Sequence, residues 1–433
     1  MNRFWIFLLL ALFGIATAMP AAAQCVPDMS VANVTVVQRA GTLPGAGDRT
    51  EHIRITQALA NRLCITAVSA NGDNSPQIRV EVTTDPTTAT PTGRSVGVFT
   101  VNAIDTNATT GTALRVEVWG RLNAGDMSNG LMKLFPTFNA STHNLATARV
   151  TVHRLAPSRT TEVNYATTGR LNPVETEHYA EPANNPGEFE EFVEFGDDHE
   201  VAVLIPHGGG IEPEISARIW RIDMNLDSST TTGQADIWEA VGQWGSGQTS
   251  RRWHITSSDV SPVSFPGLAM LTDQAAIDPY QYAVAVHGFG DTGKGILIGG
   301  RANLEEKCYV AQGIRNRLGT RREEVAITIY HEVAGQVQAI EIPDSTGRTY
   351  PRDDFDHLRG MEANNIVNRL SPNAGQTAGS GGFQFELSKG LRDDETADGR
   401  HELLDATMSA IGDRVGDLHT LPSEADGACV PFE

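Results

Sequence analysis

Two histidines that each follow an apolar run are the residues most suited to chemistry in this sequence. His207 follows residues 201–205 (VAVLI) and precedes three glycines and Glu212, whereas His287 follows residues 282–286 (YAVAV) and precedes a glycine. Such runs predict short buried strands, and the glycines allow a tight turn beside the imidazole. If the strands are neighbours, His207, Glu212 and His287 converge. Two histidines and one carboxylate, with a position left for water, are typical ligands of a single catalytic Zn²⁺.

Glu386 is the candidate for the base that a zinc hydrolase needs. Zinc lowers the pKa of bound water to about 7, and a nearby carboxylate then takes the proton. Glu386 ends the apolar run in GGFQFELSKGLR, and apolar neighbours would desolvate it and make it a better base. The alternative is an outward-facing strand glutamate with ordinary solvation, and spacing alone does not separate the two interpretations.

The segment HGGGIE also has other interpretations. It is compatible with a glycine-rich turn that carries an exposed histidine, and HGGG occurs as the oxyanion loop of lipases. A serine esterase needs a G-x-S-x-G elbow between a strand and a helix. The nearest variant, AGSGG at residues 378–382, precedes a predicted strand instead of following one, which argues against an esterase. A secreted binding protein with an inactive hydrolase-like domain is a further alternative.

The first 23 residues have the pattern of a secretory signal peptide. A positive start at Arg3 precedes an apolar stretch over residues 5–18, and small residues at 21–23 fit a cleavage site. We therefore expect an exported protein, periplasmic or extracellular, that begins near Gln24. No later stretch is long and apolar enough to predict a membrane span.

The cysteine content and the net charge limit the partners of the exported chain. Cys25, Cys64, Cys308 and Cys429 are an even number, which predicts two disulfides in an oxidising compartment. Three pairings are possible, and the simplest is Cys25–Cys64 with Cys308–Cys429. The formal charge of −20 over 433 residues argues against nucleic acid or an anionic membrane surface as a partner. It also fits poorly with a polyanionic substrate.

The chain divides into a β-rich part and an α/β part. Residues 24–155 contain short alternating runs separated by turn-prone clusters, which predict a small β-sandwich; residues 53–63 fit a helix or a strand. This accessory domain has no catalytic cluster, and a cell-wall or polysaccharide contact is possible for it. Residues 156–187 are polar and contain four prolines, so they are predicted to be a linker. Residues 188–433 are predicted to form the zinc hydrolase domain, and the acidic run 188–194 is most simply a solvated helix face.

The predicted hydrolase domain alternates strands with helices. Predicted strands cover residues 201–205, 235–241, 252–256, 282–286, 295–298, 325–330 and 383–387, and predicted helices cover residues 215–224, 304–318, 364–370 and 401–411. Alternation of this kind predicts an open, mixed or mostly parallel sheet with helices on both faces. Binding sites in such folds lie at the carboxyl ends of the strands, where His207 and His287 are placed.

Six motifs in order resemble the poly-γ-glutamate hydrolase family, once described as phage replication-related proteins. They are IPHGGGIEPEIS, RWHITSSD, AVAVHGFGD, ILIGG, NNIVNR and GGFQFELSKGLR, and they cover roughly residues 190–415. The resemblance implies a fold similar to zinc carboxypeptidases, with one zinc and cleavage of γ-glutamyl amide bonds. It also implies that His207, Glu212 and His287 bind zinc and that Glu386 is the catalytic carboxylate. The family usually has Gly-Thr after Glu-Pro, whereas this chain has Glu214-Ile215, a departure that concerns substrate preference.

Several other residues have secondary candidate roles. His254, followed by Thr256 and Ser257, matches the family's His-Ile-Thr-Ser element and either lines the cleft or forms a structural turn. Asn368 and Arg369 are placed to hold a substrate carboxylate, because arginine pairs with carboxylates through two hydrogen bonds. Arg369 could equally brace the fold. Arg392 and Arg301 are weaker candidates, and one of these arginines should stabilise the oxyanion.

The residues and the resemblance together predict a secreted zinc-dependent hydrolase of poly-γ-glutamate or γ-glutamyl peptides. An amidase or carboxypeptidase of the same fold that acts on peptidoglycan stem peptides is the alternative.

Overall fold

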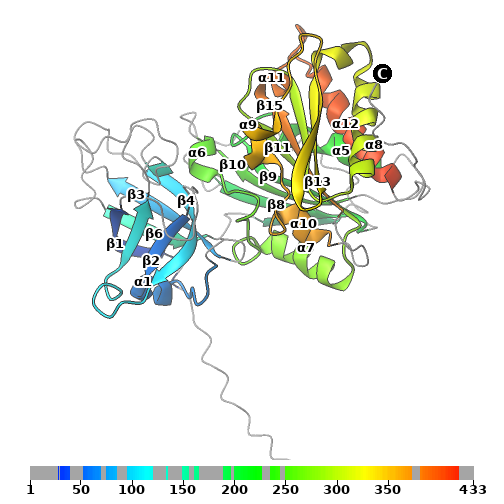
Figure 1. Ribbon diagram of the computed structural model, residues 1–433. Coiled ribbons are helices and arrows are strands. Elements are labelled where there is room, and N and C mark those ends of the chain that lie inside the picture. The colour runs from blue at the N-terminus through cyan, green and yellow to red at the C-terminus, as the bar shows by residue number, and fades with distance from the viewer. Residues whose placement is uncertain are drawn as a thin grey trace, which may run out of the picture.

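The protein folds into a small β-barrel and a larger α/β unit, which lie side by side (Figure 1). The computed structural model describes Asp28 and residues 30–39, 52–69, 75–84, 95–119, 133–134, 149–155, 160–164, 189–196, 199–226, 235–243, 249–372 and 381–418. The predicted signal peptide lies outside these residues, as do Cys25 and Cys429. Cys64 and Cys308 are both disulfide-bonded, and the predicted pairing stays a prediction.

The barrel has the strand order β1-β5-β2-β4-β3-β6 and closes where β1 pairs with β6. Its elements are β1 (Ser30–Arg39), β2 (His52–Thr56), α1 (Gln57–Arg62), β3 (Gln77–Thr84), β4 (Ser95–Asp105), β5 (Arg115–Trp119) and β6 (Arg149–Arg154). The interior is filled by alternating aliphatic side chains such as Val80, Val82, Val116 and Val118. The all-β prediction is confirmed, but the sheet is a closed barrel and not a sandwich. Side chains alternate inward and outward in the same way in both architectures. The two are distinguished by β1, which pairs with β5 at one edge and with β6 at the other and so closes the sheet.

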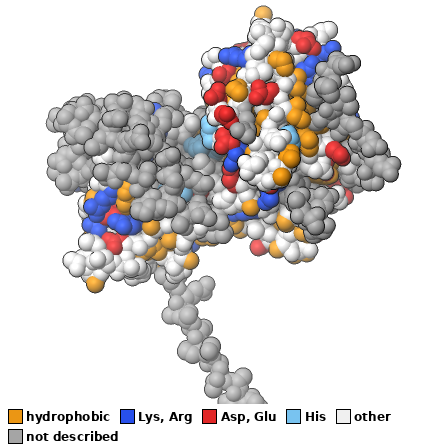
Figure 2. Space-filling model, in the orientation of Figure 1, with side chains coloured by type: hydrophobic (Ala, Val, Ile, Leu, Met, Phe, Trp, Pro, Cys, Tyr) orange, Lys and Arg blue, Asp and Glu red, His pale blue; other side chains and the backbone are white. Residues whose placement is uncertain are grey.

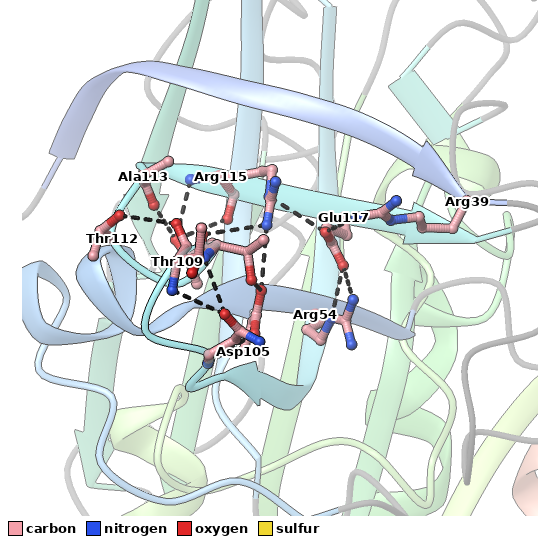
Figure 3. Close-up of polar contacts among 11 residues, drawn as sticks. Arg39, Arg54, Asp105, Thr109, Thr112, Ala113, Arg115 and Glu117 are labelled. Atoms are coloured by element: carbon pink, nitrogen blue, oxygen red, sulfur yellow. Dashed lines mark hydrogen bonds and ion pairs between the residues drawn. The ribbon is translucent and has the colours of Figure 1, made fainter.

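An ion-pair network covers the outer face of β5 (Figure 3). Glu117 lies between the inward-facing Val116 and Val118, so its side chain points out of the barrel. Arg39 and Arg54 each donate to its carboxylate at 2.6 Å, and Arg115 Nε lies 3.3 Å from Oε1. The three arginines cover Glu117 so completely that it is fully buried.

The α/β unit is built on a nine-stranded mixed sheet of order β14-β13-β12-β15-β11-β9-β10-β8-β7. The strands are β7 (Thr160–Asn164), β8 (Phe189–Phe195), β9 (Val201–Gly209), β10 (Asp236–Gly242), β11 (Tyr282–Phe289), β12 (Gly295–Gly299), β13 (Ala326–Val333), β14 (Gln336–Ile342) and β15 (Gly382–Ser388). The central strands β15, β11, β9 and β10 are parallel. Their carboxyl ends therefore meet at one edge of the sheet, as predicted.

Helices cover both faces of this sheet (Figure 1). They are α5 (Ile219–Leu226), α6 (Thr249–Trp253), α7 (Pro266–Ile277), α8 (Leu304–Leu318), α9 (Arg352–Phe355), α10 (Ile366–Leu370), α11 (Lys389–Arg392) and α12 (Glu402–Asp417), with 3-10 turns η2 (Ser216–Arg218), η3 (Gly319–Glu324) and η4 (Asp356–Leu358). One buried cluster joins α5, α8 and α12 to the first face. A second joins α6, α7 and α10 to the opposite face and also includes Val96, Val98 and Leu155 of the barrel. The barrel therefore packs on the same face as α6.

Two local predictions are wrong. Residues 252–256 were predicted to be a strand, but α6 ends at Trp253 and a turn follows. The acidic run 188–194 was predicted to be a solvated helix face, but it lies largely in β8. There Glu191 is fully buried and accepts hydrogen bonds from Trp238 Nε1 at 2.6 Å and Leu268 N at 2.8 Å. Buried donors from other elements thus decide the conformation of this run. β7 lies in the segment predicted to be a linker and pairs with β8.

Across the described residues, none of the helices has the length and apolar character needed to cross a membrane.

Candidate active site

A β-bulge in β9 determines where His207 points. Ile205 pairs with Glu239 of β10, but Gly208 pairs with Val241, so β9 uses three residues where β10 uses two. Before the bulge, Ile205 faces the cluster under α5, α8 and α12, whereas Leu204 faces the opposite side. The extra residue reverses the alternation. His207 therefore turns to the side that Leu204 faces, which is also the side of His287.

His207, Glu212 and His287 form one buried cluster. Their candidate ligand atoms all lie within 4.8 Å of one another. His207 Nδ1 lies 2.9 Å from Glu212 Oε1 and 3.0 Å from His287 Nδ1. The backbone N–H of Gly288 donates to Glu212 Oε2 at 2.7 Å, which fixes the carboxylate between the two strands. A side chain at Gly288 would collide with the Arg392 guanidinium, 2.7 Å from the position of its Cβ.

The hydrogen bonds of the two imidazoles leave one nitrogen of each ring for binding a cation. His207 Nε2 lies 2.7 Å from the carbonyl oxygen of Ile255. A carbonyl only accepts, so Nε2 carries a hydrogen, and Nδ1 is the ring nitrogen that faces Glu212 and is left to bind a metal. His287 Nε2 is held by Ser257 Oγ at 2.9 Å. Burial lowers the pKa of His287 well below its usual range, and His207 and His254 add to the effect. Neutral imidazoles oriented through their second nitrogen are the usual metal ligands.

Glu386 lies beside this cluster on β15. Its register partner on the parallel strand β11 is His287, and Gln384 Nε2 donates to its Oε1 at 2.8 Å. Along β15, Phe383 and Phe385 face the hydrophobic core, so Gln384 and Glu386 share the opposite face. Burial raises the pKa of Glu386 well above its usual range, and the charge of Glu212 raises it further. This is a carboxylate prepared to take a proton.

A cleft of about 890 Å³ opens over the cluster. It is lined by the three candidate ligands, by Glu386, and by residues of two loops, 254–258 and 355–362. The ring of His254 stacks on that of His207, with ring centres 4.1 Å apart. His254 therefore lines the cleft and also contacts a candidate ligand.

Three other candidates, Arg369, Asn368 and Arg392, are not among the described residues that line the cleft. Arg369 Nη2 donates to the carbonyl oxygen of Val260. Asn368 Nδ2 donates to Gly360 and Glu362 carbonyls, both at 2.8 Å. Arg392 is buried and donates to the carbonyl oxygen of Pro213 at 2.8 Å. These three side chains brace the loops behind the cleft, so the structure does not place them against a substrate.

Glu214, where the sequence departs from the family pattern, also lies outside the cleft lining. Its φ is 77°, in the left-handed region, which favours the glycine that the family usually has at this position. Arg218 Nη1 donates to both its carbonyl oxygen, at 2.9 Å, and its carboxylate, at 2.6 Å. The departure therefore affects the backbone behind Glu212 and not the cleft surface.

Sequence reasoning missed the carbonyl of Ile255 and the side chain of Gln384. A backbone carbonyl leaves no pattern in a sequence. Gln384 did leave one, because it is two residues before Glu386 in an otherwise apolar strand and must share its face.

A buried pair of histidines and a carboxylate, next to a glutamate with a raised pKa, is compatible with a metal-dependent hydrolase. The chain belongs to the poly-γ-glutamate hydrolase family, whose model matches residues 181–408. This confirms the family predicted from the six motifs and supports a hydrolase.

Among solved structures, a zinc-free form of YNDL is similar over 55% of this chain and 94% of its own, with 17% identity and a TM-score of 0.33. A metallo-carboxypeptidase from Burkholderia cenocepacia is similar over 64% of this chain and 73% of its own, with 8% identity and a TM-score of 0.30. A comparison with curated proteins finds no match.

Proposed function

We propose that this protein is an exported zinc-dependent hydrolase that cleaves γ-glutamyl amide bonds. The observation that carries the proposal is the convergence of His207, Glu212 and His287 beside Glu386 in one cleft. Family membership supports hydrolysis as the reaction, and the pattern of residues 1–23 supports export.

In the proposed mechanism the three ligands hold one zinc ion, which when bound polarises the scissile carbonyl and acidifies water. Ile255 and Ser257 keep the two imidazoles in the orientation that presents Nδ1 to the metal position. Glu386 takes a proton from the attacking water and delivers it to the leaving amine. Gln384 orients the Glu386 carboxylate through its hydrogen bond to Oε1.

A second candidate substrate is a γ-glutamyl peptide of the peptidoglycan stem. Among the lining residues that the structure describes, the cleft has no lysine or arginine, whereas Asp291 and Glu362 add to the carboxylates of Glu212 and Glu386. A polymer with one carboxylate per residue is repelled by such a surface. A stem peptide carries fewer carboxylates, so this observation favours it.

The test is digestion of poly-γ-glutamate and of peptidoglycan fragments side by side, with chelator and with zinc restored, together with elemental analysis of the purified protein. We expect zinc bound to the protein, cleavage that chelator abolishes, and recovery when zinc is returned. If the polymer is the substrate, its cleavage should accelerate with ionic strength, because salt screens the repulsion. Protein without zinc that gains no amidase activity on adding zinc would indicate an inactive binding protein.

A further inference from the structure

The loop at residues 254–259 connects the barrel to the candidate ligands, and we name it the bridging loop. On the cleft side, its Ile255 carbonyl and Ser257 hydroxyl hold His207 and His287 at 2.7 and 2.9 Å. The ring of His254 stacks on His207. Both imidazoles are therefore oriented by this one short loop.

The other side of the bridging loop is held by the barrel. Lys133 Nζ donates to the carbonyl oxygen of His254 at 2.7 Å and to that of Val98, in β4, at 2.9 Å. Gln77 Nε2 donates to the carbonyl oxygen of Asp259 at 2.7 Å. These bonds fix both ends of the bridging loop. One end is His254, which stacks on His207, and the other is Asp259, two residues after Ser257.

A buried pair adds to this attachment. His52 Nε2 and Asp259 Oδ2 are within hydrogen-bonding distance, and both side chains are fully buried. His52 begins β2 of the barrel, so the pair joins the two units at a position buried from solvent. A buried carboxylate is costly without its partner. Asp259 therefore favours the arrangement in which the barrel is docked.

Apolar packing makes the attachment rigid. Val96, Val98 and Leu155 of the barrel belong to the same buried cluster as Trp253, Ile255 and Phe265. In Figure 1, α6 lies on the side of the α/β unit next to β4, and in Figure 2 histidine side chains are visible on that side. The barrel thus reaches the back of the site directly.

We propose that the barrel positions the metal ligands through the bridging loop, with His52, Gln77 and Lys133 as its positioning residues. The inference rests on the proposed metal site. It gives the barrel a function inside the hydrolase, since its hydrogen bonds end on His254 and Asp259, one residue before Ile255 and two residues after Ser257. Loss of these bonds leaves the loop free to rotate away from His207 and His287, and the ligand geometry is lost with it.

The experiment measures Co²⁺ binding to the full-length protein by its visible absorption, which reports on the metal's ligands. His52→Ala and Gln77→Met each remove a barrel contact to Asp259 while sparing every candidate ligand. Loss of groups that orient metal ligands weakens metal binding by about 10–100-fold, and we expect about 10-fold here with an altered absorption spectrum.

Two variants serve as matched controls. Ser264→Ala removes the acceptor of the Gln77 N–H in the same interface, and Glu117→Gln perturbs a barrel ion-pair network whose partners are Arg39, Arg54 and Arg115 and not the bridging loop. Both should bind Co²⁺ as the wild type does.

Hydrogen exchange of the metal-free protein separates this inference from the proposed function. Peptides covering residues 253–260 should exchange faster in His52→Ala and Gln77→Met, whereas peptides of β15 should not change. The Ile366 amide, which donates to the Ser257 carbonyl at 3.1 Å, should lose protection with them. Wild-type protein that binds no Co²⁺ would overturn the metal site, while the exchange result still decides the role of the barrel. Wild-type Co²⁺ affinity and wild-type exchange in both variants would overturn the inference.

Discussion

Glu117 in the barrel and Glu386 in the cleft are both buried glutamates on strands, and their surroundings are opposite. Around Glu117, burial alone would raise the pKa, but hydrogen bonds from Arg39 and Arg54 outweigh it and hold the pKa below its usual range. Glu386 accepts a hydrogen bond from the neutral amide of Gln384. Its burial and the nearby Glu212 raise its pKa well above the usual range.

The difference separates a structural carboxylate from a reactive one. A carboxylate surrounded by guanidinium groups is stabilised as an anion and has little tendency to take a proton. A carboxylate buried beside another carboxylate is stabilised when it takes a proton. Burial is common to the two residues, so the charge of the neighbouring groups determines what each can do.

The largest effect is expected from Glu386→Gln. The amide keeps the shape of the side chain and cannot take a proton, so turnover should fall by about 10²–10⁴-fold, the usual contribution of a general base. Zinc content, measured by elemental analysis, should stay at the wild-type level. A variant that turns over normally would remove Glu386 from the mechanism and end the contrast with Glu117.

Glu117→Gln should leave turnover unchanged and lower the stability of the barrel. Hydrogen bonds between charged groups contribute about 2 kcal/mol, and the arginines lose their shared acceptor. Because the folded pKa of Glu117 is lowered, its contribution is present above the ordinary glutamate pKa and is lost as the pH falls through the folded value. Thermal melts from pH 7 downward should therefore show the wild type and the variant converging in acid. A constant difference at every pH would contradict this assignment.

The stability of the metal-free protein should respond to Glu386→Gln in the opposite direction. Because the folded pKa of Glu386 is raised, the unfolded chain ionises first, and stability falls as the pH rises from the ordinary glutamate range toward the folded value. The amide removes this loss, so the chelated variant should be more stable than the chelated wild type at neutral pH. Thermal melting curves recorded in chelator measure this difference in stability. Glu117→Gln serves as the comparison, because its change in stability should have the opposite sign.

The smallest effect is expected from Arg39→Ala. The Arg39 side chain is 42% exposed, and Glu117 keeps its contacts with Arg54 and Arg115. An exposed ion pair contributes about 0.2–1 kcal/mol, so the melting temperature should fall only slightly and less in high salt. A loss as large as that of Glu117→Gln would show that Arg39 alone holds the carboxylate.

Much of the α/β unit could be predicted because its strands and helices have strong patterns. The helix predicted over residues 304–318 matches α8, and the apolar runs before His207 and His287 are strands of one sheet. The prediction for the acidic run in β8 was wrong because two donors that hold Glu191, Trp238 Nε1 and the Leu268 amide, are distant in the sequence. Such partners are brought together by the fold, so a local pattern does not contain them.

The candidate site could be predicted in its members but not in its supports. His207, His287 and Glu386 were predicted from strand ends, Glu212 was predicted from the turn after His207, and the structure brings the four together. Arg369 was assigned to the chemistry because arginine suits carboxylates, yet its guanidinium is used on the Val260 carbonyl. Whether an arginine faces a substrate or a backbone carbonyl depends on loop conformation, which residue type does not determine.

The bulge in β9 makes the length of this strand as important as its composition. If every residue of β9 paired regularly with β10, without the bulge, the imidazole of His207 would turn to the face of Ile205, although every chemical group would still be present. Substitutions at Pro206 that keep the bulge should therefore leave the site intact, whereas those that restore regular pairing should remove His207 from it.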